Sequence, residues 1–210
     1  MTHTLAINGQ NFTMHPAGSL YWEEEGLLMI SDIHLGKVSH FRKYGTAVPR
    51  GVISENFILL DESLEFFRPA KLYFLGDLFH SYLNSEWKLF ENWVGKADTP
   101  MTLVAGNHDI ICPSRYESLD IGMVSEMVLG NFLLTHHPCE RNGFFNFSGH
   151  IHPAVRLRGT GRQSLRLPCF FKRHRQLILP AFGSFTGTHV LDRQNGDEVY
   201  AIADRQVIKI

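Results

Sequence analysis

The chain has few of the features that mark secreted, membrane-bound or strongly charged proteins. Its three cysteines, Cys112, Cys139 and Cys169, show no C-x-x-C spacing, which argues against a disulfide framework or a thiolate zinc site and indicates a reducing cytoplasm. Apolar runs such as residues 27–30 are far shorter than the roughly 20 residues that span a bilayer, so we expect no membrane partner. Residues 1–6 contain no Lys or Arg, and we expect no signal peptide.

Charge of one sign is not in excess either. The sequence has 20 Lys and Arg against 21 Asp and Glu, so no overall field draws the chain onto nucleic acid, and any binding of a polyanion must be local. The 210 residues are 44% hydrophobic, and no linker, repeat or low-complexity tract divides them. We therefore expect one globular domain over residues 1–210.

The first half of the chain has an α/β pattern. Strands that are buried on both faces are predicted at residues 27–30, 71–75 and 101–105. Apolar side chains repeat at steps of four and three over residues 53–67, which predicts an amphipathic helix. A second helix is predicted with Ser85 as its N-cap and Gly95 at its end. These segments make two β-α-β units.

The second half of the chain is predicted to contain hairpins instead of crossovers. Residues 128–134 and 191–197 each have the pattern of a strand, a tight turn and a strand. Together, the two halves indicate two sheets packed face to face with helices outside.

Polar side chains follow five of the apolar strands. The segments are Ser31-Asp32-Ile33-His34, Gly76-Asp77, Gly106-Asn107-His108-Asp109, Thr135-His136-His137 and Gly149-His150-Ile151-His152. Ligands of α/β sheets bind beyond the carboxyl ends of strands, so these loops are expected to converge. Carboxylate, imidazole and amide ligands without thiolate suit Mn, Fe, Zn or Ni, and they exceed the needs of one ion. We infer two metal ions that would clamp a phosphoryl centre during in-line displacement.

The order D-x-H, G-D, G-N-H-D, H, G-H-x-H resembles that of the calcineurin-like metallophosphoesterases. The resemblance runs from Asp32 to His152 and implies a four-layer α-β-β-α sandwich of two mixed sheets. It also implies two ligand sets that share Asp77, namely Asp32, His34, Asp77 and His152 for one metal and Asp77, Asn107, His136 and His150 for the other. The alternative is a scatter of satisfied polar turns, which the ordered pattern makes improbable.

The resemblance also implies roles for residues around the metals. His108 would stabilise the transferred phosphoryl group and protonate the leaving oxygen, with Asp109 available to orient it. Many relatives have G-D-x-x-D, whereas His80 stands at the last position here, and it is expected to support the site without binding metal. His137 is interpreted as a supporting or surface residue more readily than as a ligand.

Further segments resemble the bacterial ligase-associated DNA damage response endonuclease subfamily. They are residues 32–49, 76–81 and 180–187. This resemblance implies a manganese-dependent phosphodiesterase or endonuclease that acts in DNA repair beside a DNA ligase and a helicase. Two alternatives stay open: a nucleotide or UDP-lipid pyrophosphate hydrolase, because D-x-H-L-G and G-D-L-F also occur in UDP-diacylglucosamine pyrophosphatases, and a non-catalytic binding scaffold of the same fold.

Basic residues near the metal motifs are candidates for substrate binding. Lys37 and His40 follow the first motif and would meet a phosphate at the rim, although a solvated helix face explains them equally well. Residues 156–175 contain seven Lys or Arg and no acidic residue, which favours a phosphate backbone over a generic polar loop. The candidate contacts in this run are Arg162, Arg166 and Arg173. Phe170 and Phe171 are expected either to stack on an unpaired base or to lie in the core.

Overall fold

The computed structural model describes residues 1–43, 45, 51–161 and 163–210, which form two mixed β-sheets and four helices. The strands are β1 (His3–Ile7), β2 (Gln10–Met14), β3 (Leu20–Trp22), β4 (Leu27–Ile30), β5 (Lys71–Phe74), β6 (Met101–Val104), β7 (Gly122–Val124), β8 (Met127–Leu129), β9 (Phe132–Leu134), β10 (Phe145–Ser148), β11 (Pro153–Arg158), β12 (Ser164–Arg173), β13 (Gln176–Ile178), β14 (His189–Val190), β15 (Glu198–Ala203) and β16 (Gln206–Lys209). The helices are α1 (Lys37–Lys43), α2 (Gly51–Phe67), α3 (Ser85–Val94) and α4 (Pro113–Glu117).

The first sheet has the order β1-β2-β3-β4-β5-β6-β7. Its first four strands are antiparallel neighbours, and β4 to β7 are parallel because helices connect them. The predicted strands and the two long helices are present. The predicted N-cap Ser85 is wrong by one residue: the side chain of Asn84 accepts the hydrogen bond from the Glu86 backbone N–H at 2.9 Å, and Ser85 is the first helical residue.

The second sheet has the order β14-β11-β12-β13-β10-β9-β8, with β15 and β16 attached to β12. The predicted hairpin over residues 128–134 is formed by β8 and β9. The predicted hairpin over residues 191–197 is wrong. The strand before this segment, β14, pairs in parallel with β11, whereas β15 pairs with β12 and β16, so the segment crosses between different parts of the sheet.

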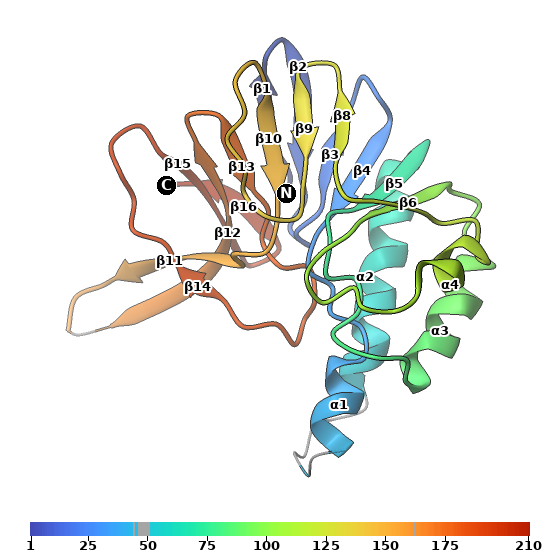
Figure 1. Ribbon diagram of the computed structural model, residues 1–210. Helices are drawn as coiled ribbons and strands as arrows, with labels where there is room; N and C mark the ends of the chain where they lie inside the picture. Colours follow the sequence, from blue (N-terminus) through green and yellow to red (C-terminus); the bar gives the residue numbers. More distant parts are fainter. Residues whose placement is uncertain (44, 46–50, 162) are drawn as a thin grey trace.

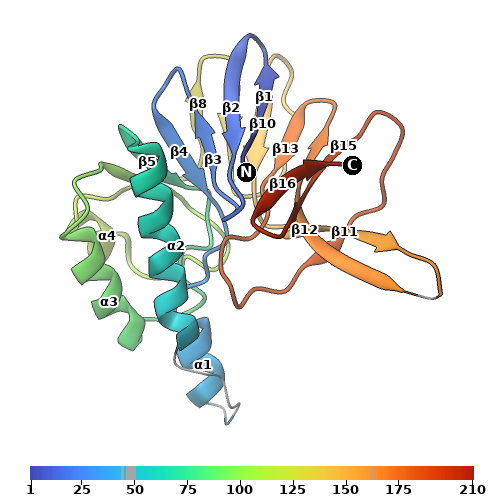
Figure 2. The ribbon, with the colours of Figure 1, turned by 180° about the vertical axis from the view of Figure 1, so that it is seen from behind.

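Figures 1 and 2 show the helices gathered beside the first sheet, with the second sheet away from them. Apolar side chains fill two layers. One cluster lies between the two sheets and includes Phe12, Phe147 and Tyr200; the other lies between the first sheet and the helices and includes Leu60 and Phe90. These layers confirm the predicted α/β class with two mixed sheets. All described helices precede β7 in the chain. The outer face of the second sheet has its own small cluster, which includes Cys169 and Phe171. Leu191 and Ile210 pack against this cluster, at the place where the four-layer arrangement was expected to have helices.

The topology brings five strand ends to one edge of the sandwich. β4, β5 and β6 run parallel in the first sheet, and β9 and β10 run parallel in the second. Each of the five is followed within a few residues by one of the polar segments identified in the sequence. The two sheets therefore present their carboxyl-end loops to a common site.

Candidate metal centre

The first group of side chains at this edge comes from the loops after β4 and β10. Asp32, His34 and His152 offer ligand atoms that all lie within 4.8 Å of one another. The Nε2 atoms of His34 and His152 are 3.3 Å apart, and His152 Nε2 lies 3.1 Å from Asp32 Oδ1. The other carboxylate oxygen of Asp32 accepts hydrogen bonds from the Ser31 hydroxyl and from the His150 backbone N–H at 2.9 Å. Oδ1 is thereby left to face the site.

The second group comes from the loops after β6, β9 and β10. His136 Nε2 lies 3.1 Å from Asn107 Oδ1 and 3.2 Å from His150 Nδ1. Asp77 lies between the two groups: its Oδ1 is 3.4 Å from His136 Nε2, and its Oδ2 is 3.8 Å from His34 Nε2. The two oxygens of this one carboxylate thus face different groups.

The hydrogen bonds behind the histidines direct lone pairs into the site. His136 Nδ1–H donates to the carbonyl oxygen of Leu75 at 2.9 Å, and His152 Nδ1–H donates to the carbonyl oxygen of Gly187 at 3.0 Å. With one proton on each ring, both Nε2 atoms carry lone pairs that point at carboxylate or amide oxygens. Asp32 Oδ1 is buried and accepts no hydrogen bond from any residue that the structure describes. Acceptors that face acceptors need a cation between them, so the donor set fits divalent metal ions.

Burial and charge shift the pKa values of the same groups. Burial lowers the pKa of His34 to about 3, which leaves the imidazole neutral and able to coordinate a metal. Burial disfavours the charged form of Asp77, but the neighbouring His136 ring lowers the pKa of this carboxyl to about 2. Burial opposes protonation of His136, yet Asp77 and Asp32 raise its pKa overall. The site therefore attracts positive charge.

The backbone at the ligands adopts a conformation that L-residues seldom use. Among the described residues, Asp32, His34, Asp77, His150 and His152 have φ values between 51° and 68°. Such residues cost about 1 to 3 kcal/mol each and persist where the surrounding structure holds them, most often at functional sites. The spacing of the motifs indicated the side chains but not this conformation.

Glycines at the strand ends make room for the ligands, a role that the motifs alone do not reveal. Gly76 has φ +82°, and a Cβ atom there would collide with the ring of His136. A Cβ atom on Gly106 would lie 2.5 Å from the backbone nitrogen of Asp77. In three motifs a glycine stands directly before the polar residue, and this position in the sequence indicates such a close approach.

His108 lies beside the two groups and is held by His80. Its Nδ1–H donates to the carbonyl oxygen of His80 at 3.0 Å, and the two rings stack with their centroids 5.1 Å apart. The expectation that Asp109 orients His108 is wrong. The buried Asp109 carboxylate instead accepts four backbone hydrogen bonds, from residues 77, 78, 79 and 106, so it holds together the loops that carry Asp77 and Asn107.

His137 lies closer to the site than its predicted role suggests. It forms a group with His136 and His150 whose ligand atoms lie within 4.8 Å of one another, and its ring centroid is 3.9 Å from that of His150. The side chain is exposed. The geometry therefore allows His137 either to contribute a ligand or to support His150.

The candidate substrate contacts differ in their positions and neighbours in the structure. Lys37 and His40 lie on α1 directly after the first metal loop, and the His40 ring is 5.4 Å from that of His80. Arg166 is exposed on β12, opposite Arg156 on β11. Arg173 Nε lies 3.8 Å from Asp197 Oδ2, so Arg173 is less available to a phosphate than Arg166, and its phosphate contact stays a prediction. Arg162 lies outside the described residues.

Of the two expectations for Phe170 and Phe171, the core position is confirmed and stacking on an unpaired base is wrong. Both side chains have no exposed surface and belong to the core clusters on opposite faces of β12, because neighbouring residues of a strand point to opposite sides of the sheet. A base cannot reach either ring.

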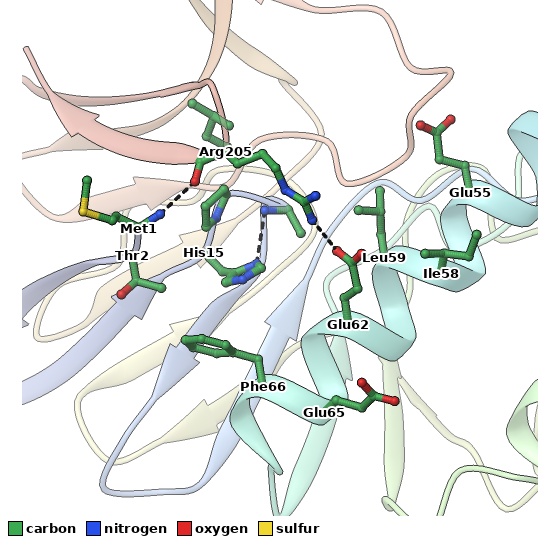
Figure 3. Close-up of a pocket in the computed structure, with 13 residues that line it drawn as sticks. Met1, Thr2, His15, Glu55, Ile58, Leu59, Glu62, Glu65, Phe66 and Arg205 are labelled. Atoms are coloured by element: carbon green, nitrogen blue, oxygen red, sulfur yellow. Dashed lines mark hydrogen bonds and ion pairs between the residues drawn. The ribbon is translucent and has the colours of Figure 1, made fainter.

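A groove of about 1190 Å³ lies apart from these side chains, between α2 and the turn that carries Arg205 (Figure 3). It is lined by 13 residues, including Glu55, Glu62 and Phe66, and none of them is a candidate ligand.

Among the described helices, none combines the length and apolar character that a membrane span requires.

Comparisons with known proteins point to one family. A sequence profile described as calcineurin-like phosphoesterase matches residues 27–166, a range that contains all seven candidate ligands. The crystal structure of Pseudomonas putida nuclease MPE is similar with a TM-score of 0.85 and 28% identity, and the alignment covers 100% of both chains. The E. coli phosphoesterase YfcE aligns with a TM-score of 0.47 and 16% identity over 88% of this chain and 97% of that chain. No curated protein sequence gives a significant match.

Proposed function

The chain belongs to the calcineurin-like phosphoesterase family and is a metal-dependent phosphoesterase, and on that premise we propose that it is a dinuclear phosphodiesterase that cleaves DNA. The observation that carries the proposal is the position of Asp77, whose two carboxylate oxygens face separate groups of ligands. A single carboxylate placed in this way is suited to bridge two ions.

The ligands divide into two sets in this proposal. Asp32, His34 and His152 would hold one ion, and Asn107, His136 and His150 would hold the other, with Asp77 shared. When bound, two divalent ions would stabilise negative charge on the phosphoryl oxygens and make water a better nucleophile at neutral pH. We propose manganese, because oxygen and nitrogen ligands without sulfur suit it; zinc, iron and nickel fit the same donors.

Residues of the protein itself would donate the proton and hold the loops of the site in place. The hydrogen bond from His108 Nδ1–H to the His80 carbonyl places the proton of the neutral ring on Nδ1, so a second proton would reside on Nε2. We assign to that Nε2–H the donation of a proton to the leaving oxygen. Asp109 would keep the loops of Asp77 and Asn107 in register through its four backbone hydrogen bonds.

The preference for DNA is supported by a relative and by one surface. The solved structure that is 28% identical over both full chains is described as a nuclease. On the hairpin of β11 and β12, Arg156 and Arg166 are directly opposed, and Arg158 lies on the same face. No acidic side chain of the described chain forms an ion pair with any of the three. Like charges directly opposite each other are unfavourable, so this face is suited to a polyanion.

The biological setting belongs to the same proposal. A role in DNA repair beside a ligase and a helicase, in the cytoplasm, is supported by the resemblance of the motifs and by the absence of disulfides among the three cysteines. The described residues 1–43, 45, 51–161 and 163–210 would act as one catalytic domain.

The test is a screen of the purified protein with each divalent metal. The substrates are a single-stranded DNA circle, a small phosphodiester, a phosphomonoester and a UDP-linked lipid. We expect cleavage of the circle and of the phosphodiester that a chelator abolishes and manganese restores best. Exclusive hydrolysis of the UDP-lipid would replace DNA with a pyrophosphate substrate, and inertness with every metal would support the binding-scaffold alternative.

A further inference from the structure

Two half-exposed aromatic rings stand at the rim of the candidate metal centre. Phe41 on α1 and Phe185 in the loop after β13 each expose 37% of their surface, and their rings meet edge to face with centroids 5.9 Å apart. The Phe41 ring also lies nearly parallel to that of His80, at 6.5 Å and 20°, and His80 is in turn stacked on His108. A row of rings therefore leads from His108 outward to solvent.

The loop of Phe185 is attached directly to the candidate ligands. Two residues before the ring, the Gly183 backbone N–H donates to the carbonyl oxygen of Asp32 at 3.2 Å. Two residues after it, the carbonyl oxygen of Gly187 accepts the hydrogen bond from His152 Nδ1–H. Phe185 is thus placed between two direct contacts with the metal loops, and its position depends on theirs.

Phe41 is anchored from the other side. The buried carboxylate of Glu86, at the start of α3, accepts hydrogen bonds from the Gly36 backbone N–H and the Ser39 hydroxyl, both at 2.7 Å. These contacts hold the beginning of α1, which follows His34 by three residues. The start of α1 and the loop of Phe185, which carry the two rings, are therefore both held close to the metal loops.

We infer that Phe41 and Phe185 form a stacking site for an unpaired nucleobase next to the phosphodiester that is cleaved. The inference rests on the proposed function, since it requires a substrate with bases. Flat apolar rings bind any base through its π-face, which gives affinity with little sequence preference. In a duplex the faces of the bases are covered by their neighbours, so this site favours single-stranded DNA or a base that has left the stack.

The experiment separates the base from the phosphate backbone. Inhibition constants against hydrolysis of a small phosphodiester are measured for a thymidine oligonucleotide and for an abasic oligonucleotide with the same number of phosphates. Their electrostatic attraction is equal, so the ratio of the two constants reports stacking. We expect the wild type to bind the thymidine oligonucleotide about 5- to 150-fold more tightly, the range for one stacked base.

Substitutions then locate the stacking surface. In Phe41→Ala/Phe185→Ala the ratio should fall to about one, and in Phe41→Tyr/Phe185→Tyr it should stay at the wild-type value. The matched control is Phe66→Ala, which removes a ring that is 61% exposed and lines the groove of Figure 3. This control should keep the wild-type ratio. If the Ala double variant loses all activity, Phe41→Leu/Phe185→Leu keeps apolar volume without the flat face and should also lower the ratio.

The outcomes distinguish this inference from the proposed function. A wild-type ratio near one, or a ratio that the Ala and Leu double variants leave unchanged, overturns the stacking site. A wild type that prefers the thymidine oligonucleotide but never cleaves DNA keeps the stacking site and overturns DNA as the substrate.

Discussion

The surroundings of His108 indicate a catalytic role more directly than those of any other residue at the site. Among the described residues it belongs to none of the groups that could hold a metal, but it stacks on His80, whose ring centroid lies 5.6 Å from that of the candidate ligand His34. For His108→Ala we expect two bound metals per chain, as in the wild type, and a kcat that is lower by about 10²- to 10⁴-fold, the range for a positioned general acid. Metal content by mass spectrometry and steady-state kinetics check both parts.

The leaving group provides the control for this role. A nitrophenyl ester needs little protonation as it leaves, so the defect of His108→Ala should shrink on that substrate compared with an alkyl ester. If the defect is equal on both esters, His108 acts through charge or position and not as an acid.

At the scale of single elements, one carboxylate links β15 to both neighbouring strands in addition to the backbone pairing with β12 and β16. Glu198 accepts hydrogen bonds from Lys172 on β12, from Lys209 on β16 and from the Tyr200 hydroxyl. The two lysines, and to a smaller extent Tyr200, lower the pKa of Glu198 to about 2, against the opposing effect of burial. Because the pKa is lower in the folded state, the charged carboxylate stabilises the fold above about pH 5, and this contribution is lost as the pH falls toward 2.

Glu198→Gln should therefore destabilise the protein by about 1 kcal/mol at neutral pH, a value reduced for solvent screening of a partly exposed group. The difference between variant and wild type should shrink as the pH falls from 5 to 3. Urea denaturation across this pH range measures it. A difference that stays constant with pH would mean that the glutamine disturbs packing and not charge.

The hairpin of β11 and β12 makes a separate prediction about DNA. It begins at Pro153, directly after His152, and extends away from the body of the protein (Figures 1 and 2). Arg156, Arg158 and Arg166 replaced together by Ala should weaken single-stranded DNA binding and reduce the slope of log K against log salt by about 2, since each phosphate contact contributes about 0.7.

Arg173→Ala is the matched control for the hairpin. Its guanidinium is close to Asp197 and to the ring of Phe171, so it removes one positive charge from the same strand without removing an available one. The salt slope should not change. An equal loss of slope in this variant would show that the total charge of β12, and not the face of the hairpin, governs binding.

For the whole molecule, the predictions from sequence held where a local pattern has one structural outcome. Buried apolar runs became β4, β5 and β6, and the polar residues after them meet because parallel strands place their carboxyl ends at one edge. The predictions failed where distant partners compete for a residue. Asp109 is next to His108 in the chain, yet four backbone N–H groups occupy its carboxylate. Residues 191–197 have the pattern of a hairpin, yet the strands on either side pair with different partners.

The ligand arrangement also links metal binding to the stability of the whole fold. The two sheets are joined at the site by loops whose carboxylates and imidazoles face one another, with strained backbone at five positions. An ion that binds only the folded chain stabilises it by about 2.7 kcal/mol at a concentration 100-fold above its Kd, which for a chain of this size raises the Tm by roughly 5 to 10 °C. We expect manganese to raise the Tm of the wild type by this amount and a chelator to reverse it. Asp77→Asn should show a much smaller rise than Asp32→Asn, because the two oxygens of Asp77 face different groups, whereas Asp32 offers only Oδ1, its Oδ2 being occupied by Ser31 and the His150 backbone N–H. Thermal unfolding monitored by circular dichroism, with metal content measured in parallel, checks this. Equal rises in the two variants would remove Asp77 from the position between the ions.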